Sequence, residues 1–276
     1  FFLSNSLLIL GPPPWTTIIE RPNLLSTFMS EIKLLNTFLS IKTFPPYFIT
    51  DISILNKMGL SIVIVHGGGP RIKRELEKKK IVSKFINGLR VTDKNIIDTV
   101  EEVLIDFNKD IVNSLKELGS VAVSFHTKND NIIEVKPERE ELGFVGIPKK
   151  ININLIEDAL NKNKIPIIAP LGLGKNNQTF NINGDTAASA IAKKLKSRRL
   201  ILMTNVEGVY DDKKTLISEI KPFDIENLIK WKIVEGGMIP KIENCVDAGK
   251  NGVRGVVILD GRTQHSSVHE VVDVSA

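Results

Sequence analysis

Three consecutive glycines separate an apolar run from a charged run in the stretch IVIVHGGGPRIKREL (62–76). A helix is predicted to begin near Pro70, because proline suits the first helical turn, where its missing N–H costs no hydrogen bond. The N–H groups of Gly67, Gly68 and Gly69 at the positive end of that helix can bind an anion. A tight turn without a ligand is the alternative, but one glycine would suffice for it. The stretch is neither G-x-G-x-x-G nor a Walker P-loop, so a dinucleotide site is not predicted.

A second polar cluster stands in NINGDTAASAIAKKL (181–195), ahead of small residues that predict a helix. If residues 181–185 are extended, the side chains of Asn181, Asn183 and Asp185 lie on one side of the chain. Two amides and a carboxylate would then converge on a ligand. The alternative is that Asp185 caps the following helix with its side-chain oxygen. The residue types leave both interpretations open.

A lysine follows a glycine pair in EGGMIPKIENCVDAG (235–249), a pattern typical of a helix start. Lys241 would lie in the first turn, where the positive end of the helix dipole mildly destabilises a cation. A bound phosphate would reverse that effect, whereas a fully solvated lysine would be little affected. The neighbouring Gly236 and Gly237 favour a functional lysine over a solvated one.

The remaining reactive residues give weaker signals. The stretch LMTNVEGVYDD (202–212) follows a strand and places Gly208 in a turn, where open α/β sheets bind ligands. The four histidines have no metal-ligand spacing, so no metal-binding residues are predicted. The single cysteine, Cys245, lies on an amphipathic run and is predicted to be packed rather than reactive.

The elements that must position these residues alternate between short apolar runs and longer amphipathic runs. Residues 95–119 have apolar positions three and four apart and end in glycine, which predicts a helix. Residues 132–146 alternate in polarity and contain turn residues, which is typical of a hairpin. Continuous Ile, Val and Leu strands between helices favour a mostly parallel sheet covered on both faces, an α/β fold. Such strands are predicted at 60–65, 120–125, 165–172, 200–204 and 255–261.

The composition is ordinary for a globular chain, with 276 residues, 42% of them hydrophobic, and a net charge of +5. Acids accompany the lysines of KRELEKKK (73–80), which favours a solvated helix face, and no aromatic residues interleave as in nucleic-acid binders. One cysteine allows no internal disulfide and indicates a reducing compartment.

The stretch FFLSNSLLILG (1–11) is too short to span a bilayer. Residues 1–28 are expected to be a disordered or targeting segment outside the fold.

Taken together, the motifs resemble the amino-acid kinase family, and within it the N-acetyl-L-glutamate kinases. The resemblance implies a three-layer αβα sandwich with a mainly parallel central sheet. It also implies an acetylglutamate-binding lobe over residues 29–178 and an ATP-binding lobe over residues 179–276. The motifs that carry it are VHGGGP (65–70), NGLRVTD (87–93), ELGFVG (141–146), IPIIAPLG (165–172), NINGDTAASAIA (181–192), GGMIPK (236–241) and DGR (260–262).

The same resemblance implies a reaction of arginine biosynthesis and the residues that carry it. ATP would transfer its γ-phosphoryl group in line to the side-chain carboxylate of N-acetyl-L-glutamate, giving an acyl phosphate, with Mg²⁺ held mainly by the nucleotide. Lys241 would stabilise the transferring group, and Asp185 would orient the catalytic lysines. Arg90 would pair with a substrate carboxylate through its planar, bidentate guanidinium. The other assignments are Gly68, Gly69 and Asn181 to acetylglutamate, and Thr204, Asn205, Gly208, Tyr210, Gly237 and Lys241 to the nucleotide.

The sequence departs from the family pattern near its beginning. Family members start with a strand carrying Lys-x-Gly-Gly, which contacts the phosphoryl group. Here no glycine stands between Gly11 and Gly59, and Lys42 is the nearest candidate lysine. Two alternatives to an active kinase are therefore open, namely a catalytically impaired acetylglutamate-binding homologue and an incomplete sequence of an active enzyme. By resemblance, the expected partners are further copies of the chain in a dimer or hexamer, L-arginine as an inhibitor and a PII-type nitrogen regulator, in the plastid stroma or cytoplasm.

Overall fold

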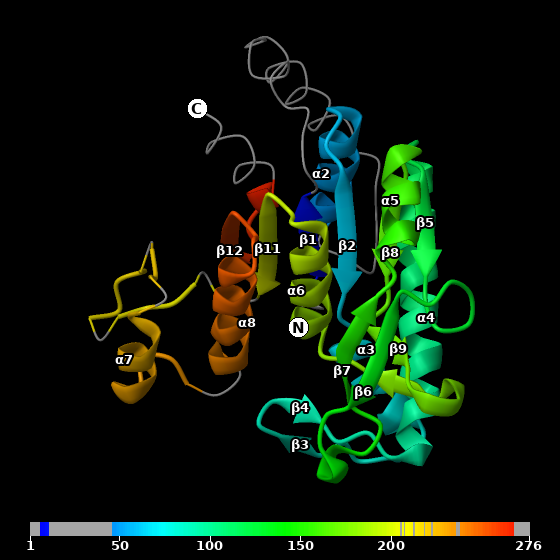
Figure 1. Cartoon of the computed structure of the whole chain (residues 1–276), viewed down its shortest axis with the longest axis horizontal. Helices are drawn as coiled ribbons and strands as arrows, with labels where there is room; N and C mark the ends of the chain where they lie inside the picture. Colours follow the sequence, from blue (N-terminus) through cyan, green and yellow to red (C-terminus); the bar gives the residue numbers. More distant parts are fainter. Residues whose placement is uncertain are drawn as a thin grey trace.

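The structure is a computed structural model that describes residues 6–10, 46–204, 206, 208–211, 213–217, 219–221, 223–235 and 238–267. At its centre lies a six-stranded sheet with the strand order β12-β11-β1-β2-β8-β5 (Figure 1). The six strands are β1 (Ser6–Leu10), β2 (Ile62–His66), β5 (Ala122–Phe125), β8 (Ile165–Ile168), β11 (Arg199–Thr204) and β12 (Gly255–Asp260).

Most neighbouring strands of this sheet run parallel. β2 and β5 both pair with β8 in parallel, and β11 pairs with β12 in the same way. The α/β class with a mainly parallel sheet is therefore confirmed. The apolar run predicted as one strand over 165–172 is divided into two strands at Pro170, which has no N–H to give to a ladder.

The strand β1 is the exception, because it runs antiparallel to both of its neighbours, β2 and β11. The sequence analysis left residues 1–28 out of the fold, and the structure differs by placing Ser6–Leu10 in the sheet. Without a strand in this position, β2 and β11 would leave buried N–H and C=O groups unpaired, and the apolar run SLLIL can pair with both. The rest of that segment lies outside the described residues.

Helices cover both faces of the sheet, which makes three layers. Because successive strand residues point to opposite faces, Ile62 and Ile64 pack with α2 and α4, whereas Val63 and Val65 pack with α5, α6 and α8. In Figure 1, α6 and α8 lie in front of the sheet. The helices are α2 (Pro46–Lys57), α4 (Lys94–Glu117), α5 (Ile153–Asn161), α6 (Gly184–Leu195) and α8 (Met238–Lys250).

Two smaller sheets lie beyond one end of the central sheet (Figure 1). One has the order β10-β9-β6-β7, and the other pairs β3 with β4. Their strands are β3 (Phe85–Ile86), β4 (Leu89–Arg90), β6 (Ile133–Pro137), β7 (Gly146–Ile151), β9 (Leu171–Leu173) and β10 (Thr179–Asn181). β6 and β7 form an antiparallel pair, but the hairpin predicted over 132–146 was too short, because its second strand begins only at Gly146. The remaining elements are α3 (Gly69–Lys78), α7 (Ile225–Lys230) and the short helices η1 (Glu140–Leu142) and η2 (Lys175–Asn177).

Candidate active site

The glycine run lies between β2 and α3, as predicted. All five residues of β2 are buried, and α3 begins at Gly69 with Pro70 in its first turn. A Cβ atom added to Gly68 would stand 2.5 Å from Cδ2 of Leu104 on α4, so packing alone explains a glycine there. A Cβ atom added to Gly69 would meet nothing within 4 Å. Gly69 therefore has no packing reason to be glycine, which favours a ligand beside it.

The glycine run opens onto a cavity of about 410 Å³, which we call the glycine-loop cleft. The N-termini of two helices meet here, because a Cβ atom added to Gly184 at the start of α6 would lie 3.8 Å from Cα of Gly67. Two positive helix ends at one cavity favour an anionic ligand. The cleft is lined by Gly67, Gly68, Gly69, Pro70, Ile72, Lys73, Phe85, Gly88, Leu89, Arg90, Leu104, Val145, Pro170, Asn181, Ile182, Asn183 and Gly184.

Arg90 brings a buried cation to this cleft. Arg90 is 9% exposed, and burial lowers the pKa of its guanidinium. Nη2 donates to the carbonyl oxygen of Gly69 at 3.3 Å, Nη1 donates to the hydroxyl of Ser83, and the guanidinium lies 4.7 Å from the ring centroid of Phe85. These described partners include no carboxylate. A buried cation without a counter-ion favours binding of an anion.

The polar cluster around residue 181 differs from both sequence interpretations. Asn183 caps α6 by accepting a hydrogen bond from the N–H of Thr186 at 3.1 Å, so Asp185 is not the cap. The chain is helical from Gly184 onward, so residues 181–185 are not extended throughout. Asn181 still reaches the cleft, and its Nδ2 donates to Oγ1 of Thr92 at 3.4 Å.

Asp185 and Lys241 form a buried ion pair between α6 and α8. Nζ of Lys241 lies 2.8 Å from Oδ2 of Asp185, and the two side chains are 6% and 10% exposed. The interpretation of Lys241 as a fully solvated lysine is therefore wrong. Oδ1 of Asp185 is buried and has no hydrogen-bond partner among the described residues. Burying two charges is expensive, so such a pair points to a functional site rather than to stability.

The family model of the amino acid kinases matches residues 46–260, which span most of the sequence. The chain belongs to the amino acid kinase family. This confirms the resemblance that the motifs indicated.

Several relatives within this family are proteins named acetylglutamate kinase. The one from Pelagibacter ubique is 46% identical over 271 residues, which cover 97% of this chain and 94% of that protein. The one from Clostridioides difficile is 47% identical over 226 residues, 80% of this chain and 79% of that protein.

Solved structures agree on the fold. The protein smu.665 from Streptococcus mutans is 33% identical with a TM-score of 0.73 and covers 82% of this chain and 91% of its own. A carbamate kinase from Giardia lamblia is only 18% identical but has a TM-score of 0.60 over 80% of this chain and 85% of its own. The three-layer αβα sandwich of the amino acid kinases is therefore the fold of this chain.

The described residues that are expected to bind the nucleotide lie outside the glycine-loop cleft. Thr204 ends β11, and its carbonyl oxygen accepts from the N–H of Gly261 just after β12, so the two strands end side by side. Tyr210 pairs with Leu216 across a small turn beyond Gly208. None of Thr204, Gly208 and Tyr210 lines the cleft. Asn205 and Gly237 lie outside the described residues.

Three features of the candidate active site were not predicted from the sequence. Lys73 lines the cleft one helical turn beyond Gly69, although its run was interpreted as a solvated face. Asn183 is the helix cap, and an Asn directly before a helical run could have indicated this. His66 is fully buried, and this burial lowers its pKa to about 3, so its imidazole is neutral behind the glycine run.

Cys245 is the one cysteine of the chain, and the structure describes its surroundings. Cys245 packs against the core beside α6, and burial raises the pKa of its thiol to about 12, so the prediction of a packed cysteine is confirmed. The described part of the chain contains no group of three or more His, Cys, Asp and Glu side chains that could hold a metal. Over the same residues, no helix has the length and apolar character needed to cross a membrane.

Proposed function

We propose that this chain phosphorylates the side-chain carboxylate of N-acetyl-L-glutamate with ATP, giving an acyl phosphate, as a step of arginine biosynthesis. The observation that carries the proposal is the glycine-loop cleft, in which two helix N-termini, Arg90 and Asn181 converge. A relative named acetylglutamate kinase covers 97% of the chain and supports the choice of substrate. An acidic substrate with two carboxylates suits a cleft that is rich in N–H donors and contains a buried cation whose described partners include no carboxylate.

The residues of the cleft would hold the substrate by its charges. Arg90 would pair with one carboxylate, and Asn181 would donate to a substrate oxygen. The N–H groups of Gly68 and Gly69 would orient the reacting carboxylate at the positive end of α3. Such positioning supplies much of the rate acceleration in phosphoryl transfer.

In the reaction, a carboxylate oxygen of the substrate attacks the γ-phosphorus of ATP. A new O–P bond forms, the bond from that phosphorus to the β–γ bridging oxygen breaks, and ADP leaves with the electron pair. Lys241 would neutralise the charge of the transferring group, and Asp185 would keep the ammonium in place, since the two are already paired at 2.8 Å. Thr204, Asn205, Gly208, Tyr210 and Gly237 would bind the nucleotide.

The side chains at the Lys241–Asp185 pair suit an ATP molecule that binds together with Mg²⁺. Oδ1 of Asp185 is a buried carboxylate oxygen without a described partner, so it would be able to face a cation that binds with the nucleotide. The ion would neutralise phosphate charge when bound.

We assign residues 29–178 to an acetylglutamate-binding lobe and residues 179–276 to an ATP-binding lobe. Most of the cleft lies in the first range, whereas the Lys241–Asp185 pair and the ends of β11 and β12 lie in the second. The presence of this buried pair and the names of the relatives favour an active kinase over a catalytically impaired homologue.

The direct test is to incubate the full chain with ATP, Mg²⁺ and N-acetyl-L-glutamate and to trap the acyl phosphate with hydroxylamine. We expect a hydroxamate that depends on ATP and on acetylglutamate, with L-glutamate as the control substrate. A folded sample that gives no hydroxamate but binds acetylglutamate in calorimetry would support the impaired homologue. A folded sample that neither reacts nor binds would contradict the proposal.

The partners implied by resemblance stay predictions. The chain is expected to form a homo-oligomer, either a dimer or a hexamer. L-arginine is expected to inhibit it, and a PII-type regulator is expected to bind it. The expected location is the plastid stroma or the cytoplasm. Sedimentation velocity of the purified chain checks the oligomer, and the hydroxamate assay with added L-arginine checks the inhibition.

A further inference from the structure

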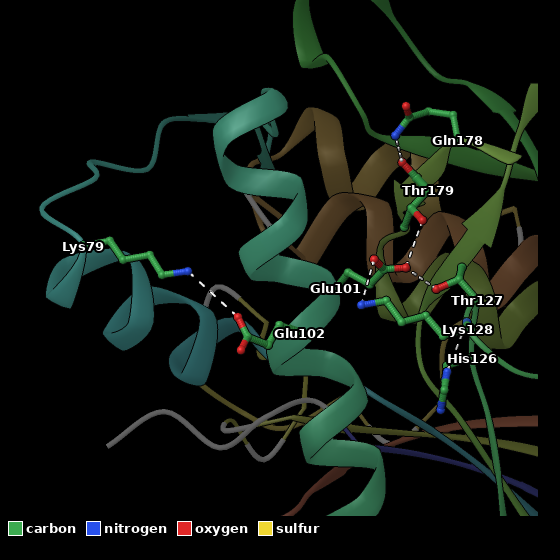
Figure 2. Close-up of polar contacts among 8 residues, drawn as sticks. All are labelled: Lys79, Glu101, Glu102, His126, Thr127, Lys128, Gln178 and Thr179. Carbon is green, nitrogen blue, oxygen red and sulfur yellow. Dashed lines mark hydrogen bonds and ion pairs between the residues drawn. The ribbon is translucent and has the colours of Figure 1, made fainter. Parts of the chain in front are cut away.

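Glu101 on α4 is a largely buried carboxylate that no step of the proposed reaction uses. Its side chain is 13% exposed. Figure 2 shows its contacts: Oε1 accepts from the hydroxyls of Thr127 at 2.5 Å and Thr179 at 2.9 Å, and Oε2 lies 3.5 Å from Nζ of Lys128. One carboxylate therefore ties α4 both to the loop after β5 and to β10.

The strand β10 is short, so side-chain contacts can add to its backbone pairing in holding its position. It has three residues and lies at the edge of its sheet, where β9 is its ladder neighbour. Thr179 and Asn181 are two residues apart on β10, so their side chains lie on the same side of the strand. The side chain of Asn181 donates to the hydroxyl of Thr92, just before α4, at a distance of 3.4 Å. The shorter bond from Thr179 to a carboxylate is the stronger attachment.

The same face of α4 also contacts the glycine run. Leu104 follows Glu101 by three residues, so the two side chains are neighbours on the helix surface. Leu104 lines the glycine-loop cleft, and its Cδ2 would lie 2.5 Å from a Cβ atom at Gly68. One face of α4 thus contacts two walls of the cleft, the glycine run through Leu104 and β10 through Glu101.

We propose that Glu101 is a positioning residue that holds β10, and with it Asn181, at a fixed distance from the glycine run. Glu101 does not line the cleft, so it is not placed to contact a substrate bound there. Its effect on acetylglutamate binding rests on the proposed function, whereas its effect on β10 does not.

The first test compares the variants Glu101→Ala and Glu102→Ala in the hydroxamate assay. Glu102 is the matched control, because it is the next residue of α4, its side chain is 69% exposed and its ion pair with Lys79 is 3.9 Å long (Figure 2). In Glu101→Ala we expect KM for acetylglutamate to rise about tenfold, with KM for ATP and kcat within about twofold, as expected when a hydrogen bond to a charged group is lost. Glu101→Gln keeps an acceptor oxygen and should recover part of the loss.

The second test measures hydrogen exchange of the segment 178–184 by mass spectrometry, without any ligand. The N–H of Asn181 donates to the carbonyl oxygen of Phe144 at 2.9 Å, so loosening of β10 should speed its exchange. We expect faster exchange in Glu101→Ala than in Glu102→Ala. Thr179→Val, which replaces the hydroxyl with a methyl group, should act in the same direction and replaces Glu101→Ala if that variant does not fold.

The outcomes separate the two proposals. Unchanged exchange in the segment 178–184, or an unchanged KM in an active enzyme, overturns the positioning role. Faster exchange in a chain whose unmodified form neither binds nor phosphorylates acetylglutamate supports the role of Glu101 and overturns only the proposed function.

Discussion

The glycine-loop cleft and the Lys241–Asp185 pair differ in how their positive charge is neutralised. In the cleft, Arg90 and two helix N-termini face a cavity, and the described partners of Arg90 are a hydroxyl and a carbonyl oxygen. In the pair, a lysine is neutralised within the chain by a carboxylate 2.8 Å away, with both side chains nearly excluded from water. The cleft is thus arranged to bind a permanent anion, whereas the pair keeps its cation available for charge that develops during a reaction.

The largest effect should come from Lys241→Ala, which removes the cation of the pair. We expect kcat to fall about 10²- to 10³-fold, the loss typical when one stabilising donor is removed from a transition state. KM for acetylglutamate should change little, because the cleft keeps its own charges. Steady-state kinetics with the hydroxamate assay measures both.

The matched control for that variant is Lys193→Ala. Lys193 also joins α6 to α8 through an ion pair, with Asp247, but the side chain of Asp247 is 51% exposed. Its removal should leave kcat within about twofold, since exposed ion pairs contribute little. Equal losses in the two variants would remove the distinction between a chemical pair and a structural pair.

The next largest effect should come from Arg90→Lys, which keeps the charge of the cleft but loses the planar donor. We expect KM for acetylglutamate to rise about 10- to 100-fold with kcat much less affected, because a bidentate contact is made in the ground state as well. Arg139→Lys is the control, since Arg139 pairs with Glu141 and its side chain is 40% exposed. A fall in kcat without a rise in KM would place Arg90 with the reacting group instead.

Substitutions of two adjacent glycines of the cleft should distinguish an effect on packing from an effect on substrate binding. Gly68→Ala should lower the free energy of unfolding by about 1–3 kcal/mol, because its new methyl group meets Leu104 in a packed core. Gly69→Ala meets open space and should unfold like the unmodified protein, but it should raise KM for acetylglutamate. Urea unfolding and kinetics check both variants.

Leu104→Ala provides the control for the packing effect. In that background Gly68→Ala should cost less than it does alone, because the two sites are in contact and their effects are not additive. A Gly69→Ala variant with unaltered KM would show that the substrate does not approach this glycine.

Elements with a strong local pattern were predictable from the sequence, and contacts between distant segments were not. Residues 95–119 show a helical period over many turns, and α4 follows them closely. Asp185 could be a cap or a ligand by its type, and only Lys241, 56 positions away in the chain, decides how it is used. Likewise, no local signal indicates that Ser6–Leu10 fills the position between β2 and β11, because strand order depends on the whole sheet.

The smallest effect concerns His66, which lies directly before the glycine run yet adds no charge to it. Burial lowers its folded-state pKa from 6.5 to about 3, so the unfolded chain binds the proton more readily. The neutral imidazole therefore contributes stability in full above pH 6.5, and this contribution is lost as the pH falls from 6.5 towards 3. Between pH 6.5 and 5 the unmodified protein should lose about 2 kcal/mol more than His66→Leu, as judged by urea unfolding at each pH. Parallel losses in the two proteins would mean that His66 accepts a proton in the folded state, and the positive charge of the cleft would then not come from Arg90 and the helix ends alone.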